Sequence, residues 1–200
     1  MKAEFILACI FCILLAAVLP CSAASSPDAI SAYNRGVDLA MEGKFDDALA
    51  SIDQAISLDQ NFTLAWITKA GILNVKGSFN ESLVASERAL AIDGNQADAW
   101  TNKASALISL QRFEEGLEAA NRAIELDPRL SEAWIDRATA LSSLNRTAEA
   151  EEAMKMAMFL METPEGTPSP LPTTRAAPLF PLLALLGTGI ALLLARKGLR

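Results

Sequence analysis

The strongest constraint on the fold is a period of 34 residues in the middle of the chain. Trp66, Trp100 and Trp134 lie 34 residues apart. The same period aligns the leucines Leu39, Leu73, Leu107 and Leu141, and the small residues Gly36, Ala70, Ala104 and Ala138. A period of this length is typical of a solenoid built from stacked units. We place four repeats at residues 29–62, 63–96, 97–130 and 131–162.

Each repeat is predicted to fold as two amphipathic helices, because apolar and small residues recur at intervals of three and four. The residues that fall between the two helices are Gly43, Gly77, Gln111 and Asn145. Glycine and asparagine readily take the left-handed conformation that ends a helix. Ser26 and Pro27 suit the start of the first helix, as its cap and first-turn residue. One helix pair cannot cover its own apolar face, so neighbouring pairs must share a core.

This pattern resembles the tetratricopeptide repeat (TPR) family, in which Trp, Leu-Gly, Tyr, Ala, Phe, Ala and Pro recur across 34 residues. The resemblance covers residues 29–162 and implies an all-α, right-handed superhelix of four helix-turn-helix repeats. Ala32 replaces the tryptophan in the first repeat, and the closing proline occurs only as Pro128. Basic residues replace a usual leucine at Arg35, Lys69, Lys103 and Arg137. We expect their aliphatic stems to pack while the charge stays in water.

The resemblance also implies that the first helix of each repeat lines a concave groove that binds a protein or peptide. The predicted groove residues are Tyr33, Val37, Ile67, Ile72, Asp98, Asn102, Glu132 and Asp136, with Ile30 and Leu64 beside them. This groove is apolar at its N-terminal end and acidic at its C-terminal end. A partner with a hydrophobic anchor and a basic end would fit it. The positions with which co-chaperone TPR domains clamp a carboxylate carry no positive charge here, so that clamp is not expected.

Two further features lie outside the groove. The fourth repeat has no additional polar helix after it, so Met158 and Phe159 are predicted to form an apolar edge for self-association or docking, unless they only fill the core. Three N-x-S/T sequons, at Asn61, Asn80 and Asn145, are candidate N-glycosylation sites. The alternative is that these residues are simply favourable in turns.

The two ends of the chain predict membrane targeting. Residues 1–24 combine a basic start, an apolar run and small residues before Ser25, as in a secretory signal peptide, with an uncleaved anchor as the alternative. Residues 176–195 are uncharged and, as a helix, about 30 Å long, which predicts a transmembrane helix. The basic tail 196–200 is then cytoplasmic and the repeats extracytoplasmic, in a single-pass cell-membrane protein of a bacterium or archaeon. Residues 163–175 form a Pro/Thr-rich stalk, in which 171–175 resembles a sortase sorting signal, so C-terminal processing is an alternative.

Composition excludes several classes of function. The chain has no histidine, and its three cysteines, Cys9, Cys12 and Cys21, all lie in the predicted signal peptide. Histidine-dependent catalysis, thiolate catalysis and structural zinc are therefore not available to the mature chain. Residues 25–162 carry a net charge of −10, which argues against nucleic-acid binding. We predict a scaffold without enzymatic activity, metal or cofactor; the alternative is a structural spacer without a specific ligand.

Overall fold

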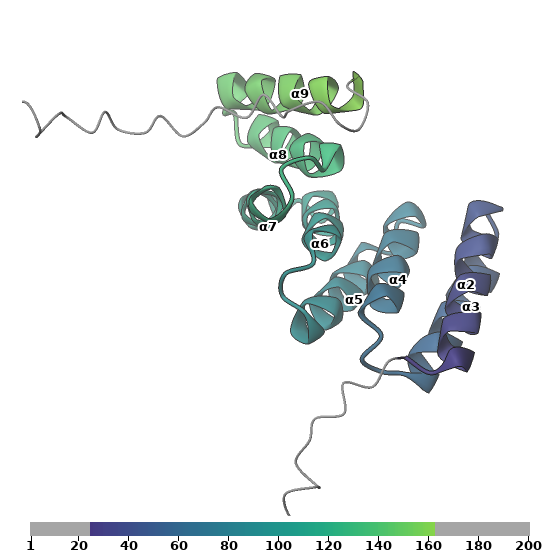
Figure 1. Cartoon of the computed structure of the whole chain (residues 1–200). Coiled ribbons are helices and arrows are strands. Elements are labelled where there is room, and N and C mark those ends of the chain that lie inside the picture. Colours follow the sequence, from purple (N-terminus) through teal and green to yellow (C-terminus); the bar gives the residue numbers. More distant parts are fainter. Residues whose placement is uncertain (1–24, 163–200) are drawn as a thin grey trace, which may run out of the picture. The chain divides into compact units, whose positions relative to one another are not determined.

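The computed structural model describes residues 25–162, which fold into eight α-helices without a strand (Figure 1). In chain order they are α2 Pro27–Met41, α3 Phe45–Leu58, α4 Thr63–Val75, α5 Phe79–Ile92, α6 Ala97–Ser109, α7 Phe113–Leu126, α8 Ser131–Ser143 and α9 Thr147–Glu162. None of these helices is long and apolar enough to cross a membrane. The predicted signal peptide 1–24, stalk 163–175, transmembrane helix 176–195 and tail 196–200 lie outside the described residues.

The helices form four pairs, and the pairs stack in chain order. The second helices α3, α5 and α7 each pack against the first helix of their own pair and against the first helix of the next pair, and α9 packs against α8. The first helices α2, α4, α6 and α8 also contact one another in succession. They therefore form one layer of a helical solenoid, and the second helices form the other layer. The right-handed sense of the superhelix stays a prediction.

The turn inside each pair depends on one residue with left-handed backbone. Its φ is +77° at Gly43, +79° at Gly77, +61° at Gln111 and +59° at Asn145. The glycines and the asparagine were predicted in this role, and Gln111 adopts it as well. The N–H of the following residue donates back into the helix, as from Arg112 to the Leu107 carbonyl at 2.9 Å. At the N-terminus of α2, Ser26 Oγ accepts a hydrogen bond from the Ala29 N–H at 3.1 Å, which confirms the predicted cap.

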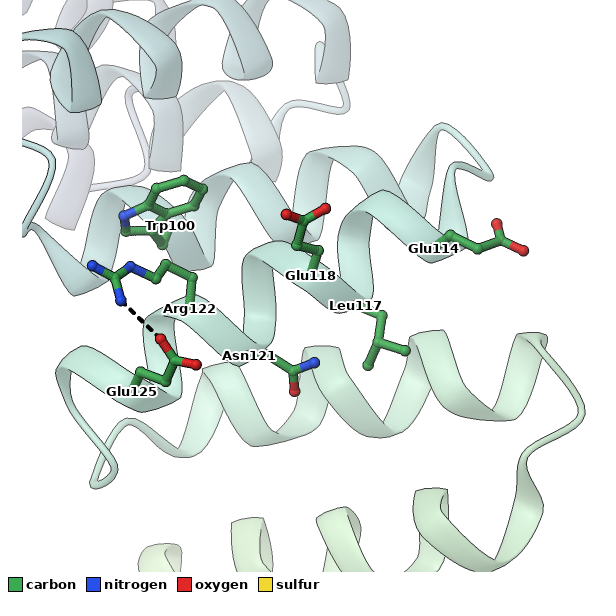
Figure 2. A pocket seen from close by; sticks show the side chains of 7 residues that line it. All are labelled: Trp100, Glu114, Leu117, Glu118, Asn121, Arg122 and Glu125. Carbon is green, nitrogen blue, oxygen red and sulfur yellow. Dashed lines mark hydrogen bonds and ion pairs between the residues drawn. The ribbon is translucent and has the colours of Figure 1, made fainter.

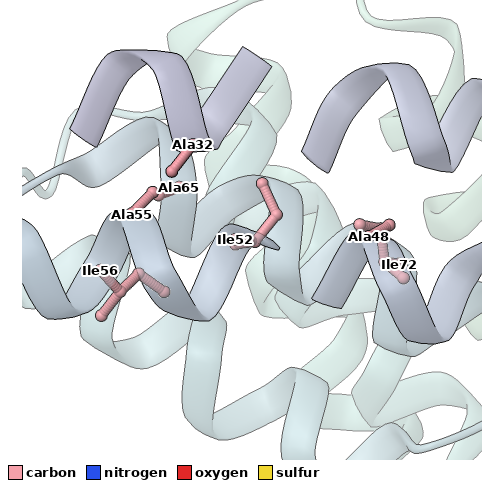
Figure 3. Close-up of a cluster of buried hydrophobic side chains, with 7 residues drawn as sticks. All are labelled: Ala32, Ala48, Ile52, Ala55, Ile56, Ala65 and Ile72. Atoms are coloured by element: carbon pink, nitrogen blue, oxygen red, sulfur yellow. The ribbon is translucent and has the colours of Figure 1, made fainter. Parts of the chain in front are cut away.

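The core between α2, α3 and α4 is built mainly from alanine and isoleucine (Figure 3). Its buried members are Ala32, Ala48, Ile52, Ala55, Ile56, Ala65 and Ile72. Alanine columns recur through the other pairs, where Ala70, Ala89, Ala104, Ala123 and Ala140 are all fully buried. Small side chains let the helix backbones approach closely, which places the few large residues under tight steric limits.

Gly36 and Ile52 show this limit most clearly. A Cβ added to Gly36 would lie 2.6 Å from Ile52 Cδ1 and 3.2 Å from the Ala48 carbonyl oxygen. Ile52 has no exposed surface and cannot move away into solvent. In the second and third repeats the glycine becomes alanine, and the isoleucine becomes Ser86 and Ala120. A larger residue on one helix is thus matched by a smaller one on its neighbour.

The turns between pairs are held by the repeated tryptophans. The indole Nε1 of Trp66, Trp100 and Trp134 donates to the backbone carbonyl six residues earlier, at 3.0, 2.9 and 2.9 Å. A basic group lies over each indole ring: Lys69 at 5.6 Å, Lys103 at 5.6 Å and Arg137 at 5.3 Å from the ring centroid. Three of the four basic residues that replace the usual leucine therefore contribute cation–π contacts.

Candidate functional site

The surface predicted to bind a partner is the groove side of α2, α4, α6 and α8, which we call the first-helix face. Six of the eight predicted groove residues are exposed or half-buried: Tyr33, Val37, Asp98, Asn102, Glu132 and Asp136. Beside Tyr33 and Val37, Ile30 is 42% exposed and Leu64 is 50% exposed. The face therefore has an accessible apolar region on the first two pairs and an accessible acidic region on the last two.

Two predicted groove residues are buried instead. Ile72 belongs to the core cluster between α2, α3 and α4 and is 6% exposed, so it is not available to a ligand. The physical reason is the position of Ile72 in the repeat. The 34-residue period aligns it with the fully buried Ala106 and Ala140, on the side of each first helix that faces the preceding pair. Ile67 is 8% exposed and packs with Ala89 and Ala99.

Polar side chains link neighbouring first helices across this face. Thr68 Oγ1 donates to Tyr33 Oη at 3.3 Å and joins α4 to α2. Asn102 Nδ2 donates to the Ile67 carbonyl at 3.1 Å and joins α6 to α4. Ser105 Oγ donates to Asp136 Oδ2 at 2.7 Å and joins α6 to α8. Asn102 and Asp136 therefore help to fix the pairs relative to one another. Ser105 was not predicted as a site residue, because nothing in the sequence distinguishes an isolated serine on a helix from any other surface serine.

The acidic end of the face concentrates negative charge around Glu132. Burial raises the pKa of Asp136 to about 6; the charge of Glu132 adds to this effect, and the Ser105 hydrogen bond opposes it. The pKa of Asp98 is also raised, first by burial and then by the charges of Asp127 and Glu132. Glu132 thus acts on both aspartates, so the three carboxylates share one electrostatic environment. Such a site favours a cationic group that would relieve their repulsion.

Comparison with protein families identifies the repeat. Two family models, both described as Tetratricopeptide repeat, match residues 97–130 and 119–152. Residues 97–152 therefore contain tetratricopeptide repeats. The TPR units found in this way fall in the third and fourth helix pairs, and the same geometry extends through the first two. The comparison with curated proteins found no match.

Solved TPR structures share the fold. TTC0263, a thermophilic TPR protein of Thermus thermophilus, is 22% identical with a TM-score of 0.62, covering 68% of this chain and 76% of that chain. MamA from Desulfovibrio magneticus RS-1 is 23% identical with a TM-score of 0.60, covering 67% and 76%. YrrB, described as a TPR protein with an unusual peptide-binding site, is 24% identical with a TM-score of 0.57, covering 66% and 69%.

The second helices of the TPR array carry hollows of their own. The third pair has one of about 510 Å³ (Figure 2), lined by Trp100, Glu114, Leu117, Glu118, Asn121, Arg122 and Glu125. Its arginine is already paired, because Arg122 donates to Glu125 at 2.8 Å. A related hollow of about 320 Å³ lies beside Trp66 in the second pair. The hollow of the third pair offers a second acidic surface, whereas the one beside Trp66 has a single glutamate, Glu81, and a single lysine, Lys69.

The three sequons occupy different environments. Asn61 and Asn145 are exposed in turns between helices of the TPR array. Asn80 is exposed within α5, but Ser82 of its sequon has no exposed surface, and its hydroxyl donates to the Ala70 carbonyl at 2.9 Å. Glycosylation stays a prediction at all three, and the turns at Asn61 and Asn145 present the sequon more openly.

Proposed function

We propose that this chain is a TPR interaction scaffold, not an enzyme, whose first-helix face binds a protein segment with an apolar anchor and a basic end. The observation that carries the proposal is the change along one continuous layer, from exposed Ile30 and Leu64 to exposed Asp98 and Glu132. The peptide-binding description of YrrB supports the use of a TPR array in this way.

The physical basis of binding differs between the two ends of the face. Apolar side chains of the partner are stabilised by covering Ile30, Leu64 and Val37, at roughly 25 cal/mol per Å² of apolar surface removed from water. A lysine or arginine of the partner that binds near Glu132 lowers the pKa values of Asp98 and Asp136 towards their ordinary range. The acidic end therefore contributes orientation and rate of association more than total affinity.

A peptide selection with charge-reversed variants tests this function. Random peptides displayed on phage are selected against the full chain in detergent micelles, and an enriched peptide is synthesised for affinity measurement by fluorescence anisotropy. We expect enriched peptides to combine an apolar residue with lysine or arginine. The double change Asp98→Lys and Glu132→Lys should lower the affinity for the selected peptide by about tenfold or more. Close charge pairs at interfaces contribute about 1.5 kcal/mol or more to binding.

The matched control changes the same number of charges on α7. Glu114 and Glu118 are exposed and line the hollow of Figure 2. The change of both to lysine should leave the affinity within about twofold. A loss of affinity confined to the α7 variant would show that the peptide binds to the second helices instead. A selection that enriches no peptide would contradict the proposal and favour the alternative, a structural spacer without a specific ligand.

We further propose that the scaffold is anchored in the cell membrane, with the TPR units outside the cytoplasm. The support is in the sequence: the signal-like residues 1–24, the uncharged run 176–195 and the basic tail 196–200. An intact mass of the native protein from membranes tests this. The expected mass lacks residues 1–24 and retains residue 200. A mass that includes Met1, or that ends within residues 171–175, would contradict cleavage of the signal or retention of the anchor; added mass at Asn61 or Asn145 would identify glycosylation.

A further inference from the structure

The outer side of the last TPR differs from the same side of the inner repeats. Ile52, Ser86 and Ala120 share one column of the second helices and have no exposed surface. Met154 follows in that column and is 41% exposed. In the next column, Ile56 is 9% exposed whereas Met158 is 54% exposed. Met161, at 66%, extends the same surface. We call Met154, Met158 and Met161 the methionine face; the predicted edge residue Phe159 is half-buried beside it.

The sequence that follows does not predict another helix to cover this face. The 34-residue period would start a fifth first helix at residue 165. That window contains Pro168, Pro170 and Pro172. A proline in a helix interior removes a backbone donor and clashes with the preceding turn.

The opposite end of the array is unsuited to cover the methionine face. Inner first helices turn Ala65 and Ile72 towards the preceding pair, and both are buried. On α2 the same columns hold Ser31 and Asp38, which are exposed. Stacking α2 of one molecule on α9 of another would bury the Asp38 carboxylate against methionine, and a pairing with the neighbouring Lys155 would leave both charges removed from water. Head-to-tail association is therefore disfavoured.

We propose that the methionine face binds the same face of a second copy of this chain, in an isologous pair with α9 antiparallel to α9. The three methionines follow one another at intervals of four and three residues, so they lie along one side of the helix. A twofold axis at Met158 places Met154 opposite Met161 of the second copy, and brings Lys155 near Glu162 of that copy. Methionine suits such a contact because its flexible thioether fills irregular gaps. This surface is separate from the first-helix face, so its failure would leave the proposed function untouched.

Single-cysteine cross-linking tests the arrangement directly. The full chain is prepared in detergent with Cys9, Cys12 and Cys21 changed to serine, and then carries either Met158→Cys or Met41→Cys. Met41 is the matched control, because it is a methionine with 83% exposure at the end of α2. Under mild copper-catalysed air oxidation, Met158→Cys should form a disulfide-linked dimer at least tenfold faster than Met41→Cys. Only a twofold arrangement places residue 158 next to its own copy.

Equal rates for the two variants would overturn the proposal, since random collision alone would explain them. So would the absence of dimer from a Met158→Cys chain with unchanged helical circular dichroism. A second variant avoids the cysteine chemistry: Met158→Asp should shift the full chain from dimer to monomer in sedimentation velocity, while Met41→Asp should not. A wild-type chain that sediments as a monomer at its highest soluble concentration would also contradict the pairing.

Discussion

Changing Ile52 to alanine is expected to lower the free energy of unfolding by about 3 kcal/mol. Ile52 has no exposed surface and packs within the cluster that joins α2, α3 and α4 (Figure 3). Removing three carbon atoms leaves a cavity that the surrounding alanines are too small to fill. Urea denaturation of the full chain, followed by circular dichroism at 222 nm, measures the change. A loss below about 1 kcal/mol would show that the first pair relaxes around the site.

The matched variant is Gly36→Ala, which is expected to cost about 1–3 kcal/mol by overpacking against Ile52. The two changes together should cost less than the sum of the single changes, because the new methyl group enters space that the isoleucine has vacated. The third repeat already combines Ala104 with Ala120 at these positions. Strict additivity would mean that Gly36 and Ile52 do not share this volume.

The second large effect is expected at Asp136, where substitution by asparagine should stabilise the fold at pH 7 by about 2 kcal/mol, or about 5 °C in Tm. The pKa of Asp136 is about 6 in the folded chain, above the ordinary value of 3.8. Its folded form therefore holds a proton that the unfolded form releases between these values. The resulting stability is complete below pH 3.8 and is lost as the pH rises through 6. Asparagine keeps an acceptor for the Ser105 hydroxyl and carries no charge.

Differential scanning calorimetry between pH 4 and pH 8 measures this effect. The wild-type Tm should fall relative to that of Asp136→Asn as the pH increases through 6, and the two should converge near pH 4. Glu118→Gln is the control, since it removes one negative charge from an exposed position on α7. Parallel pH profiles for Asp136→Asn and the wild type would show that Asp136 titrates alike in the folded and unfolded chains.

The architecture of the repeats was predictable because the 34-residue period repeats the same physical requirements in every unit. The tryptophan columns, the alanine columns and the left-handed turns at Gly43, Gly77 and Asn145 follow from residue type and spacing alone. A single helix pair would have left these features ambiguous. Four aligned copies distinguish a structural column from a chance residue.

The binding surface was less predictable, because exposure depends on how each pair sits against the next. Ile72 was assigned to the groove, yet it faces the preceding pair and is buried in the core. Asn102 and Asp136 were predicted as ligand contacts, but both also form hydrogen bonds between first helices. To predict these hydrogen bonds, one must know which residues of two neighbouring helices face each other. The residue pattern within a single helix does not give that information.

The tryptophan contacts at the turns between pairs have a consequence for observing the molecule. The chain has three tryptophans, and each indole N–H is bonded at a different junction between adjacent pairs. The first repeat carries Ala32 at the equivalent position and contributes no such chromophore. Intrinsic tryptophan fluorescence therefore reports on the three junctions, together with the helix pair against which each indole packs. With two of the indoles replaced by phenylalanine, the remaining one reports whether its own junction opens before the others.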